Sequence, residues 1–77
     1  MAGLIWQLKY AVRGLMFHHY TPMYWNLKDR EPEAAKKILK KAIHHGRKYL
    51  ETNHIGGYVQ HYDRGILNAL EKEAENQ

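Results

Sequence analysis

Residues 34–50 read AAKKILKKAIHHGRKYL, and this stretch decides the fold. Small and apolar residues recur along it in steps of four and three, the spacing that keeps side chains on one face of an α-helix. This seam consists of Ala35, Leu39, Ala42, Gly46 and Tyr49. Such a seam is typical of two helices that pack closely side by side. The stretch therefore predicts a long helix that lies against another helix.

The rest of the helical wheel agrees with this interpretation. Ile38, Ile43 and Leu50 lie beside the seam, and the opposite side is a basic face made of Lys36, Lys37, Lys40, Lys41, His44, Arg47 and Lys48. Pro32 suits the first turn of a helix, where its missing N–H is no loss, so we expect the helix to span residues 32–51. Glycine lowers helix propensity by about 1 kcal/mol relative to alanine, so Gly46 on the seam indicates a close approach at a helix crossing.

Upstream of this helix, residues 4–17 have a helical spacing of their own. One face is aliphatic, with Leu4, Leu8, Ala11, Val12, Leu15 and Met16, and a second face carries Trp6, Tyr10 and Phe17. We expect the aliphatic face to cover the core and the three rings to point outward. The ring-rich residues that follow, around Pro22, are interpreted as a turn.

Downstream, TNHIGG at residues 52–57 is typical of a helix end and turn, because Asn and Gly tolerate positive φ. A third helix is predicted over residues 58–73, with an apolar face of Tyr58, Val59, Tyr62, Gly65, Ile66, Ala69 and Leu70. The short connection predicts that the second and third helices form an antiparallel hairpin. No stretch alternates with period two for long, so the sequence predicts an all-α fold of three helices in a single domain, residues 1–77.

The chain has 77 residues, a net charge of +4 and no cysteine. A core this small is marginal and is usually reinforced by disulfides, a metal or association. Without cysteine, disulfides and thiolate zinc sites are excluded, which leaves self-association, a partner, or a site of histidines and carboxylates. We expect a homo-oligomer located in the cytoplasm.

The residues that carry chemistry predict neither a metal site nor an enzyme. The histidines, at positions 18, 19, 44, 45, 54 and 61, lack the i,i+3 or i,i+4 spacing with which a helix holds one ion. The chain has no serine, no cysteine and no glycine-rich phosphate loop. We therefore expect no catalytic residue, no metal and no cofactor.

Aromatic residues dominate the centres of protein interfaces, and this chain has a surplus of them in and before the expected turn. The predicted function is therefore that of a non-enzymatic protein that binds a protein partner through an aromatic surface. Its residues are Trp6, Tyr10, Phe17, Tyr20, Tyr24 and Trp25. The alternative is that Tyr20, Tyr24 and Trp25 fold back as a lid on the core.

Two other binding functions stay open. The basic face fits weak, non-specific contact with nucleic acid phosphates. However, the end of the third helix is expected to bring Glu71, Glu73 and Glu75 near Lys36, Lys37 and Lys40, leaving His44, Arg47, Lys48 and Arg64 unopposed. Residues 1–28 contain no Asp or Glu, so the first helix also fits peripheral binding to a membrane surface. Lys9 and Arg13 interrupt its apolar run, which excludes a transmembrane span.

Residues 54–70 read HIGGYVQHYDRGILNAL. A helix that opens with His-Ile-x-Gly-aromatic-aliphatic-Gln resembles segments of small helical accessory proteins of tailed bacteriophages. The resemblance implies a cytoplasmic protein of an infected bacterium that binds a host or phage protein rather than catalysing a reaction. His61 and Tyr62 stand where that pattern more usually has a glycine, and no site residue is assigned from it.

Overall fold

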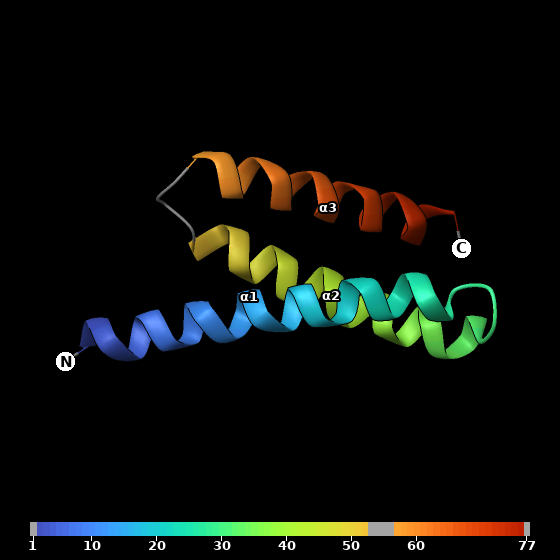
Figure 1. Ribbon diagram of the computed structural model, residues 1–77, viewed down its shortest axis with the longest axis horizontal. Coiled ribbons are helices and arrows are strands. Elements are labelled where there is room, and N and C mark those ends of the chain that lie inside the picture. Colours follow the sequence, from blue (N-terminus) through green and yellow to red (C-terminus); the bar gives the residue numbers. More distant parts are fainter. Residues whose placement is uncertain (1, 53–56, 77) are drawn as a thin grey trace.

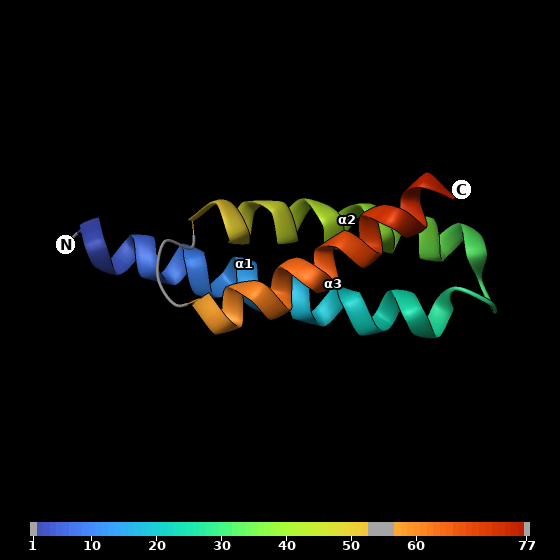
Figure 2. The same ribbon diagram turned by 90° about the horizontal axis from the view of Figure 1, so that it is seen from above.

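The computed structural model describes the backbone of residues 2–52 and 57–76, and the side chains of Leu8, 11–51 and 62–76. It contains three helices, α1 (Ala2–Leu27), α2 (Pro32–Thr52) and α3 (Gly57–Glu75). In both Figure 1 and Figure 2, α2 runs back along α1, and α3 runs in the direction of α1. No strand occurs in the described residues. The prediction of an all-α fold of three helices is confirmed.

The first helix is ten residues longer than predicted at its carboxyl end, so the interpretation of the ring-rich stretch as a turn is wrong. Pro22 lies inside α1, where it leaves the carbonyl of His18 without an N–H donor. A proline inside a helix costs about 3 kcal/mol. Phe17 and Tyr24, on either side of Pro22, are both fully buried. Because packing stabilises helices more than propensity does, these two rings can hold α1 together across the proline.

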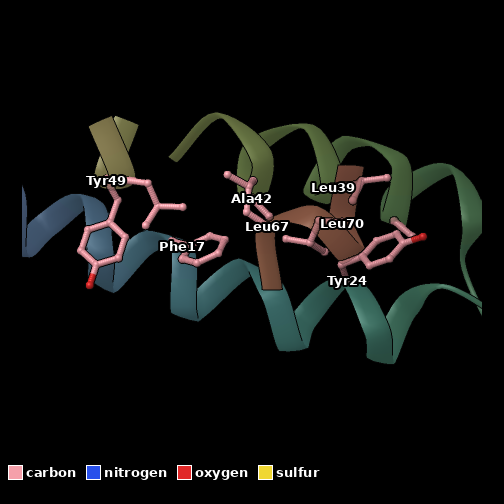
Figure 3. Packing of buried hydrophobic residues seen from close by; sticks show 9 residues of the cluster. Phe17, Tyr24, Leu39, Ala42, Tyr49, Leu67 and Leu70 are labelled. Carbon is pink, nitrogen blue, oxygen red and sulfur yellow. The ribbon is translucent and has the colours of Figure 1, made fainter. Parts of the chain in front are cut away.

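The predicted seam of α2 is confirmed, because Ala35, Leu39, Ala42, Gly46 and Tyr49 are all buried. Figure 3 shows the ring of Phe17, from α1, between Tyr49 and Ala42 of α2. A Cβ placed on Gly46 would lie 2.7 Å from Cε1 of Phe17, and one placed on Gly14 would lie 2.9 Å from Cε1 of Tyr49. Each of the two helices therefore packs one aromatic ring against a glycine of the other helix. The close approach predicted at Gly46 is confirmed.

The orientation predicted for α1 is wrong in its described part, because Phe17, which was expected to point outward, lies in the core, and the aliphatic side faces outward. Phe17 is 0% exposed, whereas Leu8, Val12 and Leu15 are 66%, 44% and 70% exposed. The physical reason lies on α2, whose seam is made mostly of small residues. Small residues on one helix leave room for large residues on the helix that packs against them. The ring of Phe17 occupies that room at Gly46.

The described part of α3 also faces the core with a different side from the one predicted. Asp63, Leu67 and Leu70 are buried, and Ile66 packs against the core, whereas Gly65 and Ala69 are exposed and Tyr62 is 72% exposed. The predicted apolar face is therefore wrong at Tyr62, Gly65 and Ala69. The side chains of Tyr58 and Val59 lie outside the described residues, as do residues 53–56 of the predicted turn.

The largest interface also differs from the one expected. The sequence predicted the second and third helices as the main pair with the first helix as a cover, but α1 and α2 share the more extensive contact. Both helices are long, and each places an aromatic ring against a glycine of the other. Helix α3 adds Leu67 and Leu70 to the core that they form. In Figures 1 and 2 the first turns of α1 project past the end of α2.

Candidate interaction surfaces

The six aromatic residues predicted to bind a partner do not form one surface. Phe17 and Tyr24 are core residues, so the contact prediction is wrong for both. Tyr20 is half-buried, its ring stacked on His45 of α2 at 5.7 Å between centroids. Trp25 is exposed, with Nζ of Lys28 at 5.2 Å from the centre of its ring. The side chains of Trp6 and Tyr10 lie outside the described residues.

The exposed apolar surface lies instead on the outer side of α1. We call it the aliphatic face, and it consists of Leu8, Ala11, Val12 and Leu15. These residues are three or four positions apart, so they follow one side of the helix. A shallow hollow of about 520 Å³ adjoins its end, lined by Leu15, Met16, His18 and His19. Three large aliphatic side chains in a row, each at least 44% exposed, are more than a small monomer usually leaves uncovered.

The basic face of α2 is exposed, but several of its cations already have acidic neighbours. Arg47 pairs with Glu71 at 3.1 Å, Lys36 with Glu33 at 3.6 Å, and Lys48 with Glu51 at 3.8 Å. The expected pairing of Glu71 and Glu73 with Lys36, Lys37 and Lys40 is therefore wrong. Arg47 and Lys48 were expected to have no acidic neighbour, and each of them has one. The error concerns the position of α3 along α2, because Glu71 contacts Arg47 near the carboxyl end of α2 and Glu73 contacts Tyr24 of α1 and Lys28.

Glu73 joins α3 to the carboxyl end of α1. Its Oε1 atom accepts a hydrogen bond from the hydroxyl of Tyr24 at 2.7 Å and lies 2.7 Å from Nζ of Lys28. These contacts, chiefly that of Lys28 and then that of Tyr24, lower the pKa of Glu73 below its ordinary value. The hydroxyl of the buried Tyr24 thus has an acceptor at the edge of the core. A tyrosine that was predicted to contact a partner instead connects two helices.

A groove between α2 and α3 was not predicted. It consists of two adjoining hollows of about 460 and 280 Å³, and both are lined by Lys40, Ile43 and Ala74. The larger hollow adds His44, Arg47, Lys48 and Glu51, and the smaller adds Lys36 and Leu39. We call this the α2–α3 groove. The signal in the sequence was Ile43, an aliphatic residue beside the seam and next to the basic face.

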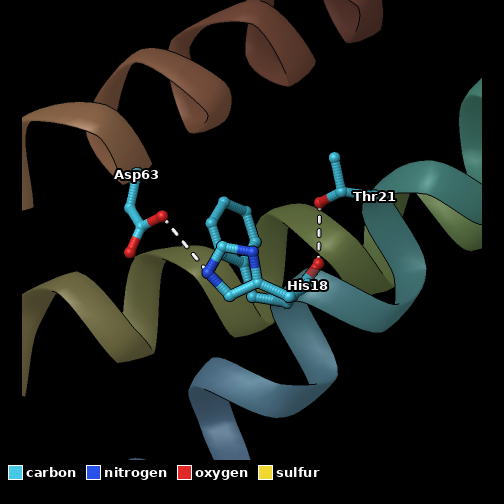
Figure 4. A network of polar contacts seen from close by, with 4 residues as sticks. His18, Thr21 and Asp63 are labelled. Atoms are coloured by element: carbon cyan, nitrogen blue, oxygen red, sulfur yellow. Dashed lines mark hydrogen bonds and ion pairs between the residues drawn. The ribbon is translucent and has the colours of Figure 1, made fainter. Parts of the chain in front are cut away.

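His18 and Asp63 form a polar contact between α1 and α3 (Figure 4), with Nε2 of His18 3.2 Å from Oδ1 of Asp63. Asp63 is almost fully buried, and its Oδ2 atom has no hydrogen-bond partner within the described chain. Nearby, the hydroxyl of Thr21 donates to the carbonyl of Phe17 at 2.7 Å. No third histidine or carboxylate joins this pair, and no group of three such residues able to hold a metal occurs among the described side chains. His54 and His61 lie outside them.

His45 provides a pH-dependent prediction. Burial against Tyr20, and then the neighbouring His44 and Lys41, lower its pKa below the ordinary value of histidine. The folded state therefore favours neutral His45, and the unfolded state binds more protons. We expect stability to fall as the pH decreases through about 6.5, the ordinary pKa, towards the lower folded value. Melting curves between neutral and mildly acidic pH test this, since His45→Gln should show a smaller decrease than wild type. An equal decrease in both would contradict it.

The comparisons with known proteins add no relative to this geometry. The chain matches no family model, and no significant similarity to a curated protein or to a solved structure was found. The resemblance of residues 54–70 to phage accessory proteins therefore stays a prediction. Among the described helices, none combines the length and the hydrophobicity needed to cross a membrane.

Proposed function

We propose that the protein is a non-enzymatic binding module that works as a homodimer, in which the aliphatic faces of two α1 helices pack together. The observation that carries the proposal is the exposure of Leu8, Val12 and Leu15 on one side of a helix whose other side is already buried. A helix that is apolar on two sides is stable when both sides are covered.

The aliphatic face suits a second copy because it carries no charge. Arg13 follows Val12 directly but lies roughly opposite Leu15 on the helix, so two copies would not bring their arginines together. Leu8 and Leu15 are two helical turns apart with Ala11 and Val12 between them. In an antiparallel pair, Leu8 of each copy would therefore meet Leu15 of the other. Such a contact is the same from both sides, as a two-fold dimer requires.

The small size of the face sets the expected affinity. Full burial of a leucine or valine contributes about 1.5–3 kcal/mol, and association itself costs at least about 4 kcal/mol. Three such residues from each copy therefore support a dimer that dissociates at roughly micromolar concentration. The dimer would bring two copies of any other binding surface together.

Leu15→Asp is expected to weaken this dimer by at least about tenfold, because it places a charge against apolar side chains of the second copy. Leu15 is 70% exposed, so the variant should keep its helix content. Asn26→Asp adds the same charge to an exposed position of α1 outside the face and should leave the dimer intact. Sedimentation velocity over a wide range of concentrations measures both variants.

A wild-type protein that stays monomeric over that range would refute the proposal. Sedimentation with anionic vesicles then tests the main rival, a membrane surface. Vesicle binding that Leu15→Asp abolishes would assign the aliphatic face to a lipid surface instead of a second copy.

A further inference from the structure

The α2–α3 groove combines an apolar floor with a cationic edge. Ile43 and Leu39 belong to the core or pack against it, and they form the floor together with Ala74. Ala74 is the smallest side chain in the groove, and it leaves room between the two helices. An apolar side chain of moderate size could lie on Ile43 and be shielded from water on two sides.

Lys40 is the central cation of the groove. It lines both hollows, and no carboxylate lies within 4.0 Å of its Nζ atom among the described residues. The neighbouring pairs Lys36–Glu33 and Lys48–Glu51 are longer than 3.5 Å and exposed. Exposed pairs of this kind contribute about 0–1 kcal/mol, so a carboxylate of a ligand can replace the glutamate at little cost.

The basic residues also have a regular spacing. Lys36, Lys40, His44 and Lys48 follow one another every four residues, about 6 Å apart along α2. A helix that has carboxylates at every fourth residue presents negative charges at the same interval. Aliphatic residues beside that acidic row would then face Ile43 and Ala74. The spacing of the basic residues, their charge and the apolar floor thus all fit one kind of ligand, a helix with an acidic row beside an aliphatic row.

We propose that the α2–α3 groove binds an acidic amphipathic helix of another protein. Single-stranded nucleic acid fits less well, because such strands bind where bases stack on large aromatic rings, and among the described residues no phenylalanine, tyrosine or tryptophan lines either hollow. No described residue of α1 lines the groove, so the proposal stands independently of the homodimer.

The test uses a labelled helical peptide with glutamate at every fourth position, leucine on the adjacent row and alanine elsewhere. Fluorescence anisotropy at moderate salt should show saturable binding, and the matching peptide with glutamine for glutamate should bind more weakly. Lys40→Glu should reduce affinity about tenfold, whereas Lys37→Glu should reduce it only about twofold. Lys37 is an exposed lysine of the same helix that lines neither hollow, so it receives the same change of charge.

A second variant tests the apolar floor without any change of charge. Ala74→Met should fill the space beside Ile43 and weaken peptide binding several-fold, and circular dichroism confirms that the exposed substitution leaves the helices intact. Equal losses from Lys40→Glu and Lys37→Glu would show general attraction to a basic helix and overturn the proposal. Failure of the acidic peptide to saturate, or tighter binding of an oligothymidine strand, would also overturn it. Leu15→Asp should leave peptide binding unchanged.

Discussion

Phe17→Ala is expected to leave most of the protein unfolded at room temperature. The ring is fully buried and lies between the two long helices, against Gly46 of α2. Removing a buried phenylalanine costs about 3–5 kcal/mol, because the lost contacts leave a cavity. A core of this size supplies only about 3–5 kcal/mol of net stability. The loss therefore equals most of the stability of the fold, and α1 would also lose its support beside Pro22.

Circular dichroism during thermal and urea unfolding measures this effect. Tyr62→Ala is the matched control, since it removes an aromatic ring at a position of α3 that is 72% exposed and lies in neither proposed binding surface. We expect its melting temperature to stay close to that of wild type. If Phe17→Ala kept its helices and melting temperature and instead changed the association of the protein, Phe17 would be a contact residue and the described core would be wrong.

Gly46→Ala is expected to destabilise the protein although alanine is the better helix former. The added Cβ would lie 2.7 Å from Phe17 and 3.1 Å from Leu67, both buried side chains with little room to move. Overpacking of this kind costs about 1–3 kcal/mol, against a gain of about 1 kcal/mol in helix propensity. We therefore expect a net loss of up to about 2 kcal/mol in the free energy of unfolding.

Gly65→Ala is the control that separates the two effects. It makes the same substitution in a helix, but the added Cβ meets no atom of the described residues within 4 Å, apart from its chain neighbours and the backbone of its own helix. The variant should therefore be more stable than wild type by up to about 1 kcal/mol, through helix propensity alone. Denaturant unfolding of both variants gives the comparison. Stabilisation by both substitutions would show that α1 and α2 do not approach closely at Gly46.

The sequence predicted α2 well because its composition is divided between its two sides. Lysines exclude one side from the core, and the apolar residues on the other side recur with one spacing. Every member of the predicted seam is buried, and the helix ends within one residue of its predicted limit. The close approach at Gly46 could be predicted because glycine lowers helix propensity, so a glycine inside a lysine-rich helix indicates a packing role.

The prediction of which side of α1 is buried was wrong, because both sides are apolar. Hydrophobicity alone favours neither side of α1, so which side is buried depends on the shape of the surface that α2 presents to it. The small residues of the α2 seam could have indicated that large rings face it. Gly14 lies on the ring-bearing side and matches Gly46, which was a second signal. The candidate surfaces changed as a result, since Phe17 and Tyr24 belong to the core, and Leu8, Val12 and Leu15 are exposed.

Other parts of the sites depend on contacts that no local pattern encodes. Pro22 resembles the start of a turn, and only the packing of Phe17 and Tyr24 on α2 shows why the helix continues. The partner of Glu73 depends on where α1 ends, which in turn depends on that continuation. The α2–α3 groove depends on the rotation of α3 about its axis. Such features combine residues from two or three helices, so they emerge only in the assembled bundle.

The two contacts between a ring and a glycine also fix how far α1 can slide along α2. A slide of seven residues in one direction would set Phe17 against Leu39, and in the other it would set Tyr49 against Thr21. Both of these positions carry a side chain where the ring now meets a glycine. The present alignment also brings His18 to Asp63 and Tyr24 to Glu73 on α3. The polar contacts of α3 therefore depend on the register of the first two helices, and they stabilise the one register in which they form.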